Sequence, residues 1–258
     1  MHTRVIEFSV PDDHAGRAAA IAALALALML GSALIAVAPP AHAKVSDPTC
    51  VPRTASIGWQ SAVAKAKTAL TTALTQMGSG HYRKASHQLN VMRHNTQVAH
   101  TKATGLIGSP PTDPESDDPP GVTAVLKVGA LEHKVATALV PLFSEQSGHR
   151  LGRPLSRGLK QAVACRDAML SKVIALKPGK RDDYVDGLSD TLSTYDKELT
   201  AISSELAAGG LTDAGRTTLT RARNVVSATQ AAMQKVFGGG ERSPSTAAAN
   251  IRVAFGHD

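Results

Sequence analysis

Apolar residues recur at intervals of three and four along most of the chain, which is the period of an α-helix and not of a β-strand. Turns that contain glycine or proline separate six such stretches. No segment alternates apolar and polar residues as a half-buried strand does. The pattern predicts an all-α fold: an antiparallel bundle of about six helices, arranged as three helical hairpins, after an N-terminal signal segment.

The fifth stretch has the most regular pattern. Its apolar residues step by three and four from Val185 to Leu206, with acidic residues and lysines outside this seam. Pro141 lies inside the third stretch and predicts a kink or an early helix end there. The expected helices cover residues 57–77, 82–104, 122–146, 154–176, 185–206 and 212–237.

Residues 1–43 have the features of a secretory signal peptide. A start with two arginines leads into an uncharged run from Ala18 to Ala38, and the small-x-small motif Ala41-His42-Ala43 predicts cleavage before Lys44. The uncharged run is also long enough to span a bilayer, so an uncleaved membrane anchor is the alternative. Either reading puts the remainder of the chain outside the cytoplasm.

The composition changes along the chain suggest a division into segments. A stretch of prolines and acidic residues follows the second expected helix, and it cannot be helical. Whether it separates two domains is left open. The expected segments are a signal peptide (1–43), an extended tether (44–56), a helical hairpin (57–107), a Pro/acidic linker (108–121), a four-helix region (122–237) and a flexible tail (238–258).

The chain has two cysteines, Cys50 and Cys165. In an oxidising compartment an even pair predicts a disulfide. The bridge would join the extended N-terminal segment to the middle of a later helix. Two buried thiols that are not linked are the alternative.

Motifs with recognisable chemistry are absent. Four histidines lie on or beside the second expected helix, at spacings of six, seven and six residues, whereas two histidines that chelate one metal from a helix lie four residues apart. We therefore expect no metal site and no cofactor, and we assign no catalytic residue. These histidines are His81, His87, His94 and His100.

Four basic residues gather before and within the fourth expected helix: Arg150, Arg153, Arg157 and Lys160. The spacing of four and three puts the last three on one side of the helix. Cations at a helix start oppose the helix dipole, and an anion bound there would relieve that conflict. We therefore predict an anion-binding site at these four residues, with a plain solvated face as the alternative.

The charge balance suggests the class of partner. The chain has 28 Lys and Arg against 21 Asp and Glu, so an exported protein of this kind is attracted to an anionic envelope polymer or an acidic protein. Nucleic acid is not expected, because the stacking aromatics that single strands need are scarce. Membrane contact is expected only if the signal segment is retained.

Together these features predict a secreted helical-bundle protein that binds a partner or builds structure in the cell envelope or exterior and is not an enzyme. Two alternatives stay open. One is an exported enzyme whose site forms only in three dimensions, and the other is a membrane-anchored extracytoplasmic domain.

Overall fold

The computed structural model describes residues 50–110 and 120–237. The predicted signal segment, most of the Pro/acidic linker and the predicted tail lie outside these described residues. Within them the fold is all-α, with no strand, as the periodicity predicts.

Six long helices correspond to the six expected ones, with a split in the fifth. They are α2 (Trp59–Gly78), α3 (Tyr82–Leu106), α4 (Pro120–Leu139), α6 (Gly152–Ile174), α8 (Leu192–Ala208) and α9 (Asp213–Phe237). Three shorter elements connect them: the 3₁₀ turn η1 (Val140–Phe143), α5 (Gln146–Arg150) and α7 (Pro178–Ser189).

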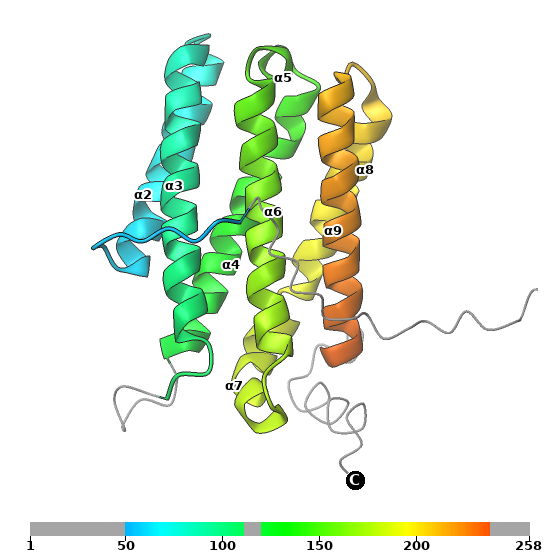
Figure 1. Ribbon diagram of the computed structural model, residues 1–258. Coiled ribbons are helices and arrows are strands. Elements are labelled where there is room, and N and C mark those ends of the chain that lie inside the picture. Colours follow the sequence, from blue (N-terminus) through cyan, green and yellow to red (C-terminus); the bar gives the residue numbers. More distant parts are fainter. Residues whose placement is uncertain (1–49, 111–119, 238–258) are drawn as a thin grey trace, which may run out of the picture. The chain divides into compact units, whose positions relative to one another are not determined.

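The long helices pack as three antiparallel pairs, α2 with α3, α4 with α6, and α8 with α9. Figure 1 shows these pairs side by side, with α3, α6 and α9 in one row and α2, α4 and α8 in a second row behind it. Helix α6 is central, because it packs on α3, α4 and α9. Side chains on α6 can therefore contact groups from most of the bundle.

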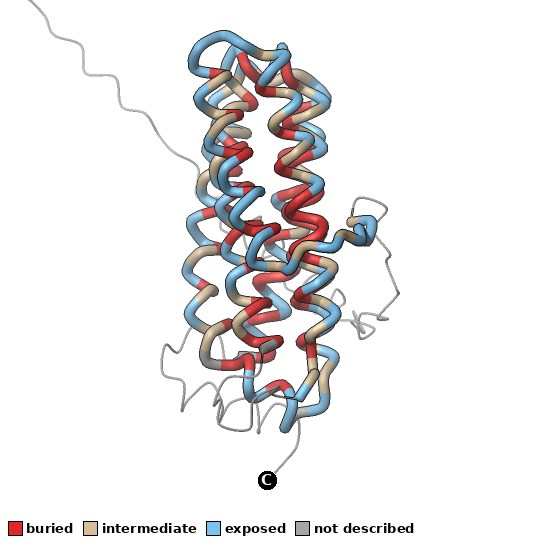
Figure 2. Tube along the Cα trace, turned by 90° about the vertical axis from the view of Figure 1, so that its left-hand side faces the viewer, coloured by how far each residue is buried: buried red, intermediate tan, exposed pale blue. Residues whose placement is uncertain are grey.

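Small residues form the interface between α2 and α3. Alanine lets two helix backbones approach closely. In Figure 2 the buried residues recur once per helical turn along the helices. Larger apolar side chains of this pair, such as Leu70, Leu89 and Met92, are buried in the same core cluster as those of α4 and α6. The buried alanines of the α2–α3 pair are Ala62, Ala66, Ala69, Ala73, Ala85, Ala99 and Ala103.

The third expected helix ends early, at the proline that predicted this. Helix α4 stops at Leu139 and the chain continues as the 3₁₀ turn that contains Pro141. Proline cannot donate the backbone hydrogen bond that the next helical turn needs. A separate short helix, α5, then leads into α6.

The prediction of one continuous fifth helix over 185–206 is wrong. The structure divides this stretch into α7 and α8, which are separated at residues 190–191. At the break, the Thr191 hydroxyl donates to the Leu188 carbonyl at 2.7 Å and the Thr194 hydroxyl donates to the Thr191 carbonyl at 2.5 Å. Threonine hydroxyls that bond nearby carbonyls compete with the helical pattern, which apolar spacing does not reveal.

Residues 50–58 form an extended segment that crosses α3 toward α6 (Figure 1). The backbone N–H of Arg53 donates to the Thr101 hydroxyl at 3.0 Å and so attaches the segment to α3. None of the helices that the structure describes combines the length and the apolar character that a membrane crossing requires.

Candidate functional site

A groove of about 380 Å³ lies between α6 and α9. Helix α6 contributes three basic side chains, those of Arg153, Arg157 and Lys160, and α9 contributes hydroxyl groups. The sequence-based prediction put these three basic residues on one side of a helix, and the structure places all three along this groove. The other lining residues are Gly152, Ser156, Ala214, Thr217 and Thr218.

The local sequence explains why the groove lies at the start of α6. Helix α6 begins at Gly152, two residues earlier than predicted, and Leu151 before it provides no side-chain cap. The first turn contains no acidic residue. Backbone N–H groups at such an end have no partner within the helix, and they carry the positive end of the helix dipole.

Hydroxyl groups hold the two sides of the groove together. The Thr218 hydroxyl lies 3.2 Å from that of Ser156, across the interface between α9 and α6, and 2.7 Å from the Ala214 carbonyl. One helical turn after Thr217 and Thr218, the exposed Arg221 lies on the same side of α9. The cations that line the groove itself come from α6.

The basic region continues from the groove across α6 onto α3. Burial lowers the pKa of Arg93, and the nearby charges of Arg157 and Arg53 lower it further. The Arg93 side chain is held in place, because its Nε donates to Oε1 of Gln161 at 3.2 Å. The guanidinium group of Arg93 thus lies close enough to those of Arg157 and Arg53 to be repelled by both.

No carboxylate balances these cations within residues 50–110 and 120–237. In that part of the chain, neither Arg53 nor any of the three basic residues of the groove forms an ion pair. Clustered like charges oppose the folded state. An anion in the groove would remove this repulsion.

Arg150, the fourth residue of the predicted site, lies elsewhere. Its guanidinium group lies over the ring of Tyr82, 4.9 Å from the ring centre, at the start of α3. The Arg150 guanidinium group therefore interacts with the Tyr82 ring and does not line the groove. The structure thus brings together three of the four predicted residues and, through Arg157, adds Arg93 with its neighbour Arg53. No spacing rule within one helix could have found the added residues, because they come from other segments.

A second group of charges is buried between α4, α6 and α8. Arg166 donates two hydrogen bonds to Glu198, from its two terminal nitrogens at 2.7 and 3.1 Å. Nδ1 of His133 lies 2.9 Å from the same carboxylate. The sequence analysis placed the acidic residues of the fifth stretch outside its apolar seam, and for Glu198 this is wrong, because its side chain is 0% exposed.

The partners of Glu198 keep it charged. Burial alone raises the pKa of this carboxyl group, but the hydrogen bonds and positive charges of His133 and Arg166 outweigh burial and bring the pKa below its usual value. Arg166 also lies over the ring of Tyr195, 4.5 Å from the ring centre. The charged groups of Arg166 and Glu198 therefore both have partners within the cluster.

A cavity of about 110 Å³ adjoins this cluster, with His133, Arg166 and Tyr195 among mostly apolar walls. The Tyr195 hydroxyl is buried without a hydrogen bond, and burial raises its pKa, so the phenol remains protonated. Pockets that hold cofactors or drug-sized ligands measure about 300–1,000 Å³. The cavity is too small for such a ligand, and the charged groups beside it already bind one another, so the cluster supports the fold.

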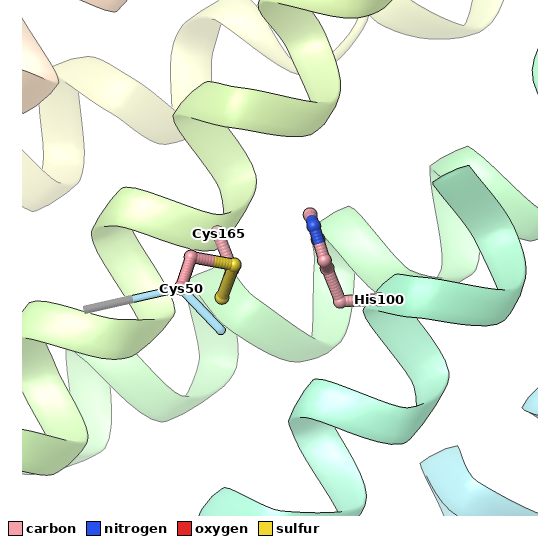
Figure 3. A group of neighbouring side chains, drawn as sticks. All are labelled: Cys50, His100 and Cys165. Carbon is pink, nitrogen blue, oxygen red and sulfur yellow. A yellow bond between two sulfur atoms is a disulfide. The ribbon is translucent and has the colours of Figure 1, made fainter. Parts of the chain in front are cut away.

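The two cysteines are paired at disulfide distance, as predicted. Their sulfur atoms are 2.08 Å apart and their Cα atoms 5.0 Å apart. Figure 3 shows that His100, from α3, lies beside the pair. A nitrogen of His100 and the two sulfurs all lie within 4.8 Å of one another.

Comparisons of the chain with protein-family models, with curated proteins and with solved structures give no match.

Proposed function

We propose that the protein is a non-enzymatic binding protein that acts outside the cytoplasm and holds an anionic polymer in the groove between α6 and α9. One observation carries the proposal: Arg153, Arg157 and Lys160 line a single groove, and none of them has a carboxylate partner among the described residues. Phosphate and carboxylate groups fit this lining, because guanidinium and hydroxyl groups both donate hydrogen bonds to anionic oxygens.

The strength of exposed ion pairs favours a polymer over a single small anion. One exposed pair contributes about 0–1 kcal/mol, so a small anion would be held weakly. A chain of regularly repeated anionic groups engages several cations at once, and each further contact forms at high effective concentration. The basic region suits this mode, because Arg157 lies both on the groove and beside Arg93.

The surface of the bundle favours a polymer over an acidic protein. Stable protein interfaces have an apolar, often aromatic centre. Among the described residues, Val51 is the large hydrophobic side chain that stands exposed, at 49%. Over residues 50–110 and 120–237 the surface therefore offers charge and hydroxyl groups but no exposed apolar centre for a protein partner.

Two features support a location outside the cytoplasm. The first is the predicted signal segment at residues 1–43. The second is the pairing of Cys50 and Cys165, since disulfides persist mainly in oxidising compartments.

Fluorescence anisotropy with labelled inorganic polyphosphate and labelled polygalacturonate tests the proposal. The two probes distinguish a preference for phosphate from a preference for carboxylate. The groove variant is Arg153→Ala/Arg157→Ala/Lys160→Ala. The control variant, Lys67→Ala/Lys84→Ala/Lys134→Ala, removes three exposed lysines from α2, α3 and α4, so it changes the net charge equally.

We expect the groove variant to bind the preferred polymer about 10- to 100-fold more weakly than the parent, from about 0.5–1 kcal/mol for each lost contact. The control should change the affinity by less than about 3-fold. Equal losses in the two variants would show that only net charge attracts the polymer, and the proposal would be wrong. It would also be wrong if the parent bound neither probe at low salt.

A further inference from the structure

Three ligand atoms from three separate segments meet beside α6. They are the sulfurs of Cys50 and Cys165 and a nitrogen of His100, all within 4.8 Å of one another. Cys50 belongs to the extended N-terminal segment, Cys165 to α6 and His100 to α3 (Figure 3). Cys165 is 0% and His100 7% exposed, so water has little access to the two helical residues.

Next to these atoms, buried polar groups lack hydrogen bonds. Nδ1 of His100 has none, and neither has either carboxylate oxygen of Glu132. The two residues lie at ion-pair distance, with 3.5 Å between Nδ1 of His100 and Oε1 of Glu132. A buried polar atom without a hydrogen bond destabilises the folded state. Such groups persist where a ligand or ion completes them, which gives a second reason to look for a ligand here.

We propose that reduction of the Cys50–Cys165 disulfide converts this place into a zinc site, formed by the two thiolates and the His100 imidazole with the Glu132 carboxylate beside it. Two sulfurs and one imidazole nitrogen are a ligand set that Zn²⁺ prefers, whereas Ca²⁺ and Mg²⁺ require oxygen ligands. The proposal does not depend on the groove between α6 and α9.

The chemistry balances with an external thiol as the reductant. Two thiol groups, for example those of dithiothreitol, give two electrons and two protons to the disulfide, which becomes two Cys–SH groups while the reductant becomes a disulfide. Zn²⁺ then replaces the two thiol protons, which pass to water. One Zn²⁺ and two thiolates carry no net charge together, so the buried site gains no uncompensated charge.

The geometry requires only a small movement. Zn–S bonds of about 2.3 Å in a tetrahedron place the two sulfurs about 3.8 Å apart, so the sulfurs must separate once the disulfide is broken. Cys165 is held within α6, whereas Cys50 lies three residues before Arg53, whose N–H attaches the exposed segment to α3, so the movement falls on Cys50. Glu132 lies 3.5 Å from Nδ1 of His100, so it can orient the ring for ligation through Nε2, which lies 3.3 Å from the Thr104 hydroxyl.

Metal titration of the reduced protein tests the proposal. Co²⁺ reports thiolate ligands by its sulfur-to-metal charge-transfer band and tetrahedral geometry by its d–d bands. Zn²⁺ affinity follows from competition with a chromophoric chelator. The variants are His100→Gln, Cys50→Ser and Glu132→Gln. The matched control is His87→Gln, since His87 is an exposed histidine on the same helix.

We expect the reduced parent and the His87 control to bind one equivalent of Zn²⁺ and the oxidised parent to bind none at this site. Loss of a positioning carboxylate weakens zinc binding by about 10- to 100-fold, which we expect for Glu132→Gln, and loss of a ligand in the other two variants should exceed that. The fold of the reduced protein is followed by circular dichroism.

Three results would overturn the proposal. The first is a reduced parent that binds no zinc, or binds no more than the oxidised one. The second is equal zinc affinity in reduced parent and His100→Gln. The third is a chain that loses its helical signal on reduction and does not regain it with zinc, because the site needs the folded bundle to bring α3 and α6 together.

Discussion

Arg166 and Glu198 bind each other through two parallel hydrogen bonds in the interior of the bundle, where Glu198 is 0% and Arg166 3% exposed. The pair joins α6 to α8. Burial of two charges carries a desolvation penalty that their attraction offsets only when both partners are present. The pair therefore makes the fold sensitive to the loss of either residue alone.

Arg166→Met should lower the free energy of unfolding by about 3–5 kcal/mol, because it leaves a buried carboxylate without its guanidinium partner. The double variant Arg166→Met/Glu198→Leu should return to within about 1 kcal/mol of the parent or exceed it. Urea denaturation measures both. Lys197→Met, at the exposed neighbour of Glu198, is the control, with a change below about 0.5 kcal/mol. A double variant no more stable than the single one would contradict this account.

The contribution of Glu198 should depend on pH. Its pKa is below the usual value in the folded state, because His133 and Arg166 outweigh the effect of burial. A carboxyl group with a lowered pKa stabilises the fold above its unfolded pKa of about 4.3, and this stabilisation is lost as the pH falls through the folded value. The difference in unfolding free energy between parent and Glu198→Gln should thus be largest near pH 7 and shrink below about pH 4. A difference that stays constant from pH 7 to pH 3 would show that ionisation of Glu198 does not matter.

The disulfide should stabilise the fold by a large amount. Cys50 and Cys165 are 115 residues apart in sequence, and closing a loop of that size contributes about 4–5 kcal/mol in the chain-entropy model. Urea denaturation with and without dithiothreitol, in the presence of a metal chelator, measures the effect. The Cys50→Ser/Cys165→Ser variant should match the reduced parent and be insensitive to reductant. If reduction lowered the free energy of unfolding by less than about 1 kcal/mol, contacts other than the disulfide would hold the N-terminal segment on the bundle.

Two glycines near the start of α6 should differ in how strongly substitution by alanine affects stability. A Cβ at Gly148 would lie 2.2 Å from the backbone oxygen of Phe143, whereas a Cβ at Gly152 has no atom within 4 Å. Gly148→Ala should therefore cost about 1–3 kcal/mol through overpacking, and Gly152→Ala should change stability by less than about 0.5 kcal/mol. Thermal unfolding distinguishes them. Similar effects at both positions would show that the turn between η1 and α5 can relax.

The fold was largely predictable because each helix carries its own apolar period and its own terminating residue. Pro141 is one case: the early helix end at this residue follows from its chemistry alone. The break near Thr191 was not predictable, since it depends on hydroxyl-to-carbonyl bonds within a seam whose spacing stays regular. Glu198 shows the same limit, because its burial depends on Arg166, which lies on another helix.

The candidate site was predictable only along α6. The spacing of Arg153, Arg157 and Lys160 places them together without knowledge of the fold. The second side of the groove, with Thr217 and Thr218, comes from α9 and depends on how the helices pack. Likewise, the even number of cysteines predicted a pair, but nothing in the sequence places His100 beside it.

Backbone amide chemical shifts during addition of inorganic polyphosphate test the groove most directly, because they locate the bound polymer. The account predicts that the largest shifts fall on residues 152–160 of α6 and 214–221 of α9, with α2 unchanged. The contradicting result is binding whose shifts spread over all basic surfaces or centre on the exposed lysines of α2, with the amides at the start of α6 unmoved.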